Sequence, residues 1–254
     1  MYKVITKCRI CDNTNLVSVL QLGEQALTGV FPVLGSKPVT TGPLELVKCH
    51  AEDDSKCCGL LQLRHSYSMD ELYGANYGYR SGLNPTMVEH LHSKVSTIMC
   101  HVDLAPGDLV IDIGSNDSTL LQGYGRKDID LLGFDPTAIK FHKYYPDHIG
   151  LVPDFFSRNS ARTHLSSRKA KIITSISMFY DLEDPIEFMS TVYDCLADDG
   201  VWVFEQSYMP TMLQMNAYDT VCHEHLEYYG LRQIKWMTDR CGFKIVDVLS
   251  LIHI

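Results

Sequence analysis

Residues 109–118 read Leu-Val-Ile-Asp-Ile-Gly-Ser-Asn-Asp-Ser, and this stretch decides the fold. Five mostly apolar residues are typical of a buried strand, and the polar, glycine-containing turn after them leads into a segment that predicts a helix. In α/β sheets, ligands bind beyond the carboxyl ends of parallel strands, where glycine lets the backbone approach a ligand closely. We therefore expect a ligand site here, with Gly114 at the approach and with Asp112, Asn116 and Asp117 around it.

Five further apolar runs of strand length follow, separated by segments long enough for crossover helices. Short buried strands that alternate with helices predict an α/β fold, a Rossmann-like, doubly wound and mostly parallel sheet with helices on both faces. Asn84-Pro85 reads as an N-cap with proline at the first helical position, so we expect a helix from there to about His101. The six expected strands are Leu109–Ile113, Asp130–Phe134, His148–Val152, Lys171–Ile176, Val201–Glu205 and Phe243–Val248.

Acidic residues also follow the second and third expected strands. Asp135, which precedes Pro136, lies about 20 residues beyond Asp112, where an acid typically accepts hydrogen bonds from ribose hydroxyls. The pyrophosphate-binding pattern G-x-G-x-x-G is absent, which favours an adenosine without phosphates over a dinucleotide. Asp154 would meet the adenine amino group, with Phe155 beside the ring. One aspartate at a strand end is often only a helix cap, so the prediction rests on all three acids at successive strand ends.

The N-terminal part of the chain holds five of the nine cysteines. It has few residues that could build a core, and clustered cysteines in a chain without a signal peptide favour a metal over disulfides. A tetrahedral zinc site needs four ligands, and a site with four protein ligands is structural. The favoured ligands are Cys8, Cys11, Cys49 and Cys58. Cys57 and His50 are competing ligands, and a set of buried free thiols is the alternative to a metal site.

Composition and charge exclude other classes of partner. The formal net charge is −9 and lysine and arginine do not cluster, which argues against nucleic acid, because duplex binding depends on neutralising phosphates. No apolar run approaches the roughly 18 residues that a membrane span needs, and the first ten residues lack the features of a signal peptide. We therefore expect a cytoplasmic protein that does not bind membranes, and oligomeric state is left open.

Five motifs occur in a fixed order over nearly the whole chain. Together they resemble the sugar C-methyltransferases of deoxysugar and surface-polysaccharide pathways, which have an N-terminal zinc-binding domain. The resemblance implies a zinc-binding domain over 1–66, a connector and helix over 67–104, and an S-adenosylmethionine-binding domain over 105–248. Ser118 departs from the family, which usually has glycine there, and an insertion precedes Cys58. The motifs are Cys8-x-x-Cys11, Cys58-Gly-Leu-Leu-Gln-Leu63, Asn76-Tyr-Gly-Tyr-Arg-Ser-Gly82, Asp112-Ile-Gly-Ser-Asn-Asp117 and His223-Glu-His-Leu-Glu-Tyr-Tyr229.

The resemblance implies methyl transfer from S-adenosylmethionine to a carbon beside the ketone of a nucleotide-linked keto-deoxysugar. Such chemistry needs a base to remove the α proton and donors to stabilise the enolate. By resemblance, His225 is the base and Glu224 orients it or contacts a sugar hydroxyl. Supporting roles go to His223, Tyr228 and Tyr229, and Tyr77 and Tyr79 would cap the sugar site.

Several alternatives stay open for these residues. The histidines could be solvated loop residues and the tyrosines could pack between domains. Asp181 is a candidate substrate contact, whereas Asp184-Pro185 predicts the start of a helix. The chain could instead be an O- or N-methyltransferase on the same scaffold, or a zinc-containing interaction protein without catalysis.

The end of the chain carries its own expectation. Methyltransferase sheets of this kind normally have a seventh, antiparallel strand. The family that this chain resembles usually has a further C-terminal domain. The last six residues, 249–254, equal the translation of a transposon-end sequencing adapter. We therefore expect a C-terminally truncated gene fragment that lacks the seventh strand, in which the natural sequence ends near Val248 and residues 249–254 are an artefactual tail.

Overall fold

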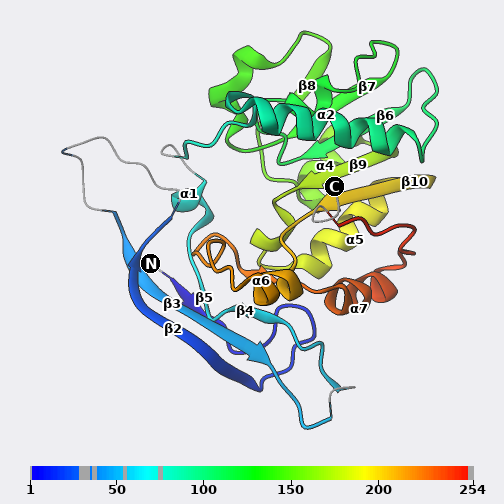
Figure 1. The fold of residues 1–254 in the computed structure, drawn as a ribbon. Helices are drawn as coiled ribbons and strands as arrows, with labels where there is room; N and C mark the ends of the chain where they lie inside the picture. The colour runs from blue at the N-terminus through cyan, green and yellow to red at the C-terminus, as the bar shows by residue number, and fades with distance from the viewer. Residues whose placement is uncertain (1, 29–34, 36–38, 54–55, 74–76, 251–254) are drawn as a thin grey trace.

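The computed structural model describes residues 2–28, 35, 39–53, 56–73 and 77–250, and contains two main sheets. A parallel sheet and its helices form the upper part of the molecule in Figure 1, and a long antiparallel ribbon forms the lower part. Residue Asn76 of the connector motif and residues 251–254 of the expected tail lie outside the described residues. No helix in the described ranges has the length and apolar character that a bilayer crossing requires.

The parallel sheet has five strands in the order β10-β9-β6-β7-β8, and every neighbouring pair is parallel. The chain runs outward from β6 through β7 to β8 and then returns to β9 on the other side of β6. This reversal makes the gap between β6 and β9 the topological switch point, and the predicted doubly wound fold is confirmed. The bounds are β6 (Leu109–Ile113), β7 (Asp130–Phe134), β8 (Ile149–Val152), β9 (Ala170–Ile176) and β10 (Leu196–Glu205).

Helices cover both faces of this sheet because successive strand side chains point in opposite directions. Val110 packs in one apolar cluster with residues of α2 (Pro85–Met99) and α3 (Thr119–Gln122). Its neighbour Ile111 packs in a second cluster, with residues of the helices on the other face. Those helices are α4 (Arg158–Leu165), α5 (Pro185–Cys195) and α7 (Leu231–Cys241). The β7–β8 connection contains the 3-10 helix η3 (Ala138–Tyr144).

Two helix starts follow local capping rules. The Asn84 side chain accepts a hydrogen bond from the Thr86 amide at 3.0 Å, with Pro85 at the first helical position. At the start of α5, Asp184 accepts from the Glu187 amide at 2.9 Å, again before a proline. Both predicted starts are confirmed, and α2 ends at Met99.

The prediction of a sixth strand was wrong. Phe243–Val248 forms no strand, and no strand of the described chain pairs with it. Phe243 and Ile245 pack against the core, whereas Val246 is 81% exposed. Phe243 and Ile245 therefore face the core without sheet pairing, because a strand also needs a partner for its backbone hydrogen bonds.

The antiparallel sheet joins the two ends of the chain. Its order is β11-β4-β3-β2, and β11 (Glu227–Tyr228) comes from the C-terminal part, within the histidine motif His223–Tyr229. It pairs Glu227 with Gln62 and Tyr228 with Leu61 of β4. The N-terminal strands are β1 (Lys3–Val4), β2 (Leu16–Ala26), β3 (Thr41–Cys49), β4 (Leu61–Leu63) and β5 (His65–Ser66), with β1 and β5 paired separately.

Candidate active site and zinc centre

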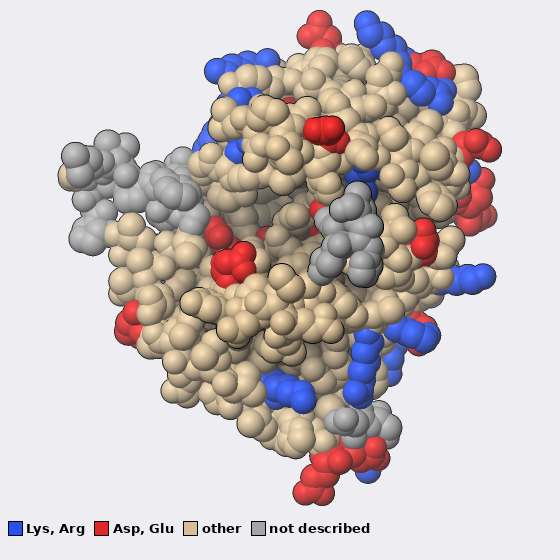
Figure 2. Space-filling view, viewed as in Figure 1, with Lys and Arg blue, Asp and Glu red and all other residues tan. Residues whose placement is uncertain are grey.

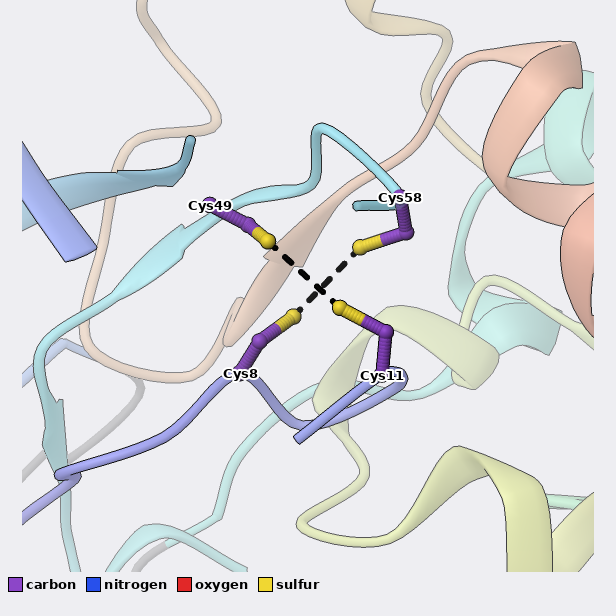
Figure 3. A group of neighbouring side chains, drawn as sticks. All are labelled: Cys8, Cys11, Cys49 and Cys58. Carbon is purple, nitrogen blue, oxygen red and sulfur yellow. Dashed lines mark hydrogen bonds between the residues drawn. The ribbon is translucent and has the colours of Figure 1, made fainter. Parts of the chain in front are cut away.

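Four cysteine sulfurs converge on one point in the N-terminal part (Figure 3). The sulfurs of Cys8 and Cys58 lie 3.4 Å apart, those of Cys11 and Cys49 lie 3.5 Å apart, and all four fall within 4.8 Å of one another. A tetrahedral zinc ion with Zn–S bonds near 2.3 Å separates its sulfurs by about 3.8 Å. The donor set and its spacing therefore fit zinc.

The fourth position of this cluster belongs to Cys58. The Cys57 sulfur lies instead 3.9 Å from the carbonyl oxygen of Cys49, outside the group of four. Gly59 adopts a left-handed φ of 72°, and the Cys58 sulfur accepts from the Leu60 amide. The turn after Cys58 thus aims its sulfur, and His50 is not part of the cluster.

Arg9, between the first two cysteines, ties the zinc centre to the histidine motif. Its side chain is 3% exposed, and its Nε lies 3.6 Å from Oε1 of the fully buried Glu227. Its guanidinium also donates to the Leu63 carbonyl oxygen at 2.7 Å and to Ser66 Oγ at 2.8 Å. Glu227 follows His225 by two residues, so the cysteine turn helps to fix the segment that carries that histidine.

A cavity of about 410 Å³ lies at the carboxyl ends of the parallel strands. The face of the molecule drawn in Figure 2 has a hollow in its middle, with acidic side chains at the margin of the hollow. Four acids line the cavity, and no lysine or arginine is among the described lining residues. The predicted residues that line it are Asp112, Gly114, Asn116, Asp135, Pro136, Phe155, Tyr77, Tyr79, Glu224 and His225.

Asp112 lies at the switch point between β6 and β9. It is 3% exposed, and its carboxylate accepts a hydrogen bond of 2.6 Å from Thr174 Oγ1 on β9. Burial raises the pKa of Asp112 to about 7, although the bond from Thr174 lowers it. Beside it, Gly114 has a φ of 75°, and a Cβ there would lie 3.3 Å from Met178. The left-handed glycine keeps the cavity floor open.

Asn116 and Asp117 hold the connector instead of facing only the cavity. Asn116 Oδ1 accepts from the Ser81 amide at 2.9 Å, and its Nδ2 donates to the Tyr79 carbonyl oxygen at 3.1 Å. Asp117 accepts from the Gly82 amide at 2.9 Å, and it does not line the cavity. These bonds position Tyr79, which is 48% exposed, at the cavity.

The other two strand-end acids have different surroundings. Asp135 is 6% exposed and accepts from the Asn116 amide at 2.8 Å and from the Thr137 amide at 2.6 Å. It thereby joins the turns after β6 and β7. Asp154 is exposed and lies outside the cavity lining, where it accepts from the amide of Phe155. Of the expected adenine contacts Asp154 and Phe155, only Phe155 lines the cavity.

The histidine motif divides between the cavity and the core. His225 Nδ1 lies 2.8 Å from the Thr220 carbonyl oxygen, and since a carbonyl can only accept, Nδ1 carries the hydrogen. The neutral ring therefore keeps its lone pair on Nε2. Glu224 also lines the cavity, and burial raises its pKa. His223 is fully buried elsewhere, 3.3 Å from the Gly42 carbonyl oxygen and in edge contact with Tyr67.

The cavity is also lined by Asp181 and Tyr73, for which the sequence analysis predicted little or no role. Asp181 ends the 3-10 helix η4 (Phe179–Asp181), and Tyr73 follows α1 (Met69–Leu72). The Tyr73 hydroxyl donates to Asp181 Oδ2 at 2.7 Å. The sequence predicted no role for Tyr73, because nothing in the local sequence pairs it with an acid 108 residues away.

Comparisons with known proteins agree with this geometry. A methyltransferase domain family matches residues 89–248, and a zinc binding domain family matches residues 8–73. The C-methyltransferase NovU of Streptomyces niveus is 26% identical over 250 residues, covering 96% of this chain and 57% of its own length. This chain thus spans little more than half of that relative.

Two solved structures share the fold at low identity. A chain of the complex between the Haloferax volcanii Trm112 methyltransferase activator and a methyltransferase matches with a TM-score of 0.51 at 14% identity, over 63% of this chain and 72% of that one. The plantazolicin methyltransferase BamL, solved with a substrate analogue and SAH, matches with a TM-score of 0.50 at 16% identity, over 61% and 60%. The domain match spans more than half of the sequence, so the chain belongs to the methyltransferase domain family.

Proposed function

We propose that this chain binds S-adenosylmethionine at the end of β6 and methylates a carbon beside the ketone of a nucleotide-linked keto-deoxysugar. Family membership and the likeness to a C-methyltransferase support the reaction class. The sugar and its nucleotide rest on the motif resemblance.

The cavity suits a positively charged methyl donor. Asp112 and Asp135 come from neighbouring strand ends, Phe155 offers an aromatic face, and Gly114 leaves room for close backbone approach. The donor, when bound, supplies an electrophilic methyl group on a sulfonium. A lining with acids and without lysine or arginine stabilises such a cation.

The single observation that carries the proposal is the orientation of His225. Because its Nδ1–H donates to Thr220, the neutral ring offers Nε2 as a base, and the same cavity is lined by Asp112 and Asp135. Removal of an acidic C–H proton next to a ketone requires such a group within reach of the substrate. His225 therefore takes the α proton, and the half-buried Glu224 beside it contacts a sugar hydroxyl.

Solvent exchange tests this function. The zinc-loaded protein is incubated in D₂O with thymidine-diphosphate-linked 4-keto-6-deoxyglucose as the probe, without methyl donor. We expect deuterium to enter at the carbon next to the ketone, and His225→Asn to slow this by about 10²–10⁴-fold. The exposed His148→Asn serves as the matched control. Methylation of a hydroxyl without any carbon exchange would contradict the proposal.

A further inference from the structure

We propose that Asp181, held by Tyr73, donates a hydrogen bond to the ketone oxygen of the acceptor while His225 removes the neighbouring proton. This assignment rests on the proposed function and adds the group that stabilises the enolate. Asp181 touches the substrate and is catalytic in this scheme, whereas Tyr73 acts through Asp181 and is a positioning residue.

The geometry gives Asp181 one occupied and one unpartnered oxygen. Its Oδ2 accepts from the Tyr73 hydroxyl at 2.7 Å, while its buried Oδ1 has no hydrogen-bond partner among the described residues. The residue is 8% exposed, and it lines the same cavity as His225 and Glu224. A buried polar atom without a hydrogen-bond partner costs about 1–3 kcal/mol, which a hydrogen bond to a ligand atom would recover.

The surroundings of Asp181 keep its proton in place. Burial raises the pKa of Asp181 well above its usual range, and the nearby Cys222 and Glu224 raise it further. His225 and the bond from Tyr73 oppose this shift but do not cancel it. Because Tyr73 already donates to Oδ2, the proton of the neutral acid sits on Oδ1, the oxygen without a partner.

This arrangement supports enolate formation with every atom accounted for. His225 Nε2 takes the α proton, the C–H electron pair becomes the C=C bond, and the carbonyl π pair moves onto oxygen. The Oδ1–H of Asp181 shares its hydrogen with that oxygen without transferring it. When the carbon bonds to the methyl group, the S–CH₃ pair stays on sulfur, and the ketone reforms. Acids kept neutral by an apolar site are known to stabilise enolates in this way.

Variants at position 181 distinguish a hydrogen-bond donor role of Asp181 from a role of its ionised carboxylate. Asp181→Ala removes the hydrogen bond and should slow solvent exchange into the sugar probe by about 10²–10³-fold. Asp181→Asn keeps an acceptor for Tyr73 and an N–H donor in place of Oδ1–H, so we expect it to stay within about tenfold of the wild type. Asp147→Asn, an exposed acid away from the cavity, is the control. An asparagine variant as slow as the alanine variant, or an unaffected alanine variant, would overturn the assignment.

Tyr73→Phe tests the positioning role through the pH dependence. The tyrosine hydroxyl lowers the pKa of Asp181, so its removal raises that pKa and keeps the acid protonated to higher pH. The high-pH limit of exchange should therefore move upward in Tyr73→Phe. An unchanged limit would mean that the hydroxyl only packs against its neighbours.

An infrared measurement needs no sugar and separates this proposal from the proposed function. The difference spectrum of wild type minus Asp181→Asn at neutral pH should contain a protonated carboxyl band. If wild type gives no exchange with the probe but shows this band, the proposed function fails while the charge state of Asp181 stands. If exchange occurs and the band is absent, the donor role of Asp181 is wrong.

Discussion

The cysteine cluster and the cavity at the strand ends are both built from polar groups, but they are completed in opposite ways. In the cluster, four sulfurs face one another, and every ligand position of a tetrahedral ion is taken by protein. In the cavity, Asp181 Oδ1 and Glu224 Oε1 are buried without hydrogen-bond partners among the described residues. A site whose ligand positions are all taken by its own chain supports the structure, whereas a site with unpartnered polar atoms can bind a ligand.

The largest expected effect comes from opening the saturated site. Cys58→Ser should reduce zinc from about one ion per chain to near zero and lower Tm by about 10 °C or more, because structural zinc contributes several kcal/mol to folding. Cys57→Ser is the matched control, since Cys57 lies outside the cluster, and should keep its metal. Metal analysis and thermal unfolding measure both, and loss of zinc from Cys57→Ser alone would reverse the ligand assignment.

A pH titration tests the cavity through its buried acid Asp112. Below about pH 4, Asp112 is protonated in the folded protein and in the unfolded chain. As the pH rises from there to about 7, Asp112 ionises in the unfolded chain but keeps its proton in the folded protein. The free energy of unfolding of wild type, relative to Asp112→Asn, should therefore fall over this range by about 4 kcal/mol and then stay constant. Urea denaturation at several pH values checks this, and a flat difference would show that Asp112 is not held in an apolar site.

The link between the two regions can be broken at Arg9. Arg9→Met leaves buried Glu227 without its cation and should cost about 3 kcal/mol of stability. Combining it with Glu227→Gln should cost less than the sum of the two single changes. Denaturant unfolding of the four proteins gives the coupling energy. Strict additivity would mean that the zinc turn and the histidine segment are independent.

The smallest expected effect concerns the connector at the cavity edge. Asn116→Ala removes the acceptor for the Ser81 amide, which should cost about 1 kcal/mol and speed exchange of that amide. The Gly82 amide, which donates to Asp117, is the internal reference. Equal protection of Ser81 in both proteins would show that Asn116 does not hold the connector.

Local patterns predicted the parts of the fold that local rules control. The expected bounds of β6 and β7 agree with the structure, and the two Asx-Pro helix starts follow from side-chain capping. The same patterns could not show that Phe243–Val248 lacks a strand partner. Nor could they find the Tyr73–Asp181 bond or the pairing of β11 with β4, because these join residues far apart in the chain.

Titration of the zinc-loaded chain with S-adenosylhomocysteine is the most direct test of the account. The structure predicts that about one molecule binds per chain at the end of β6. Gly114→Val should abolish binding, since a side chain there is strained at φ 75° and crowds Met178. A wild-type protein that carries zinc and takes up no ligand would contradict the claim that this cavity is a methyl-donor site.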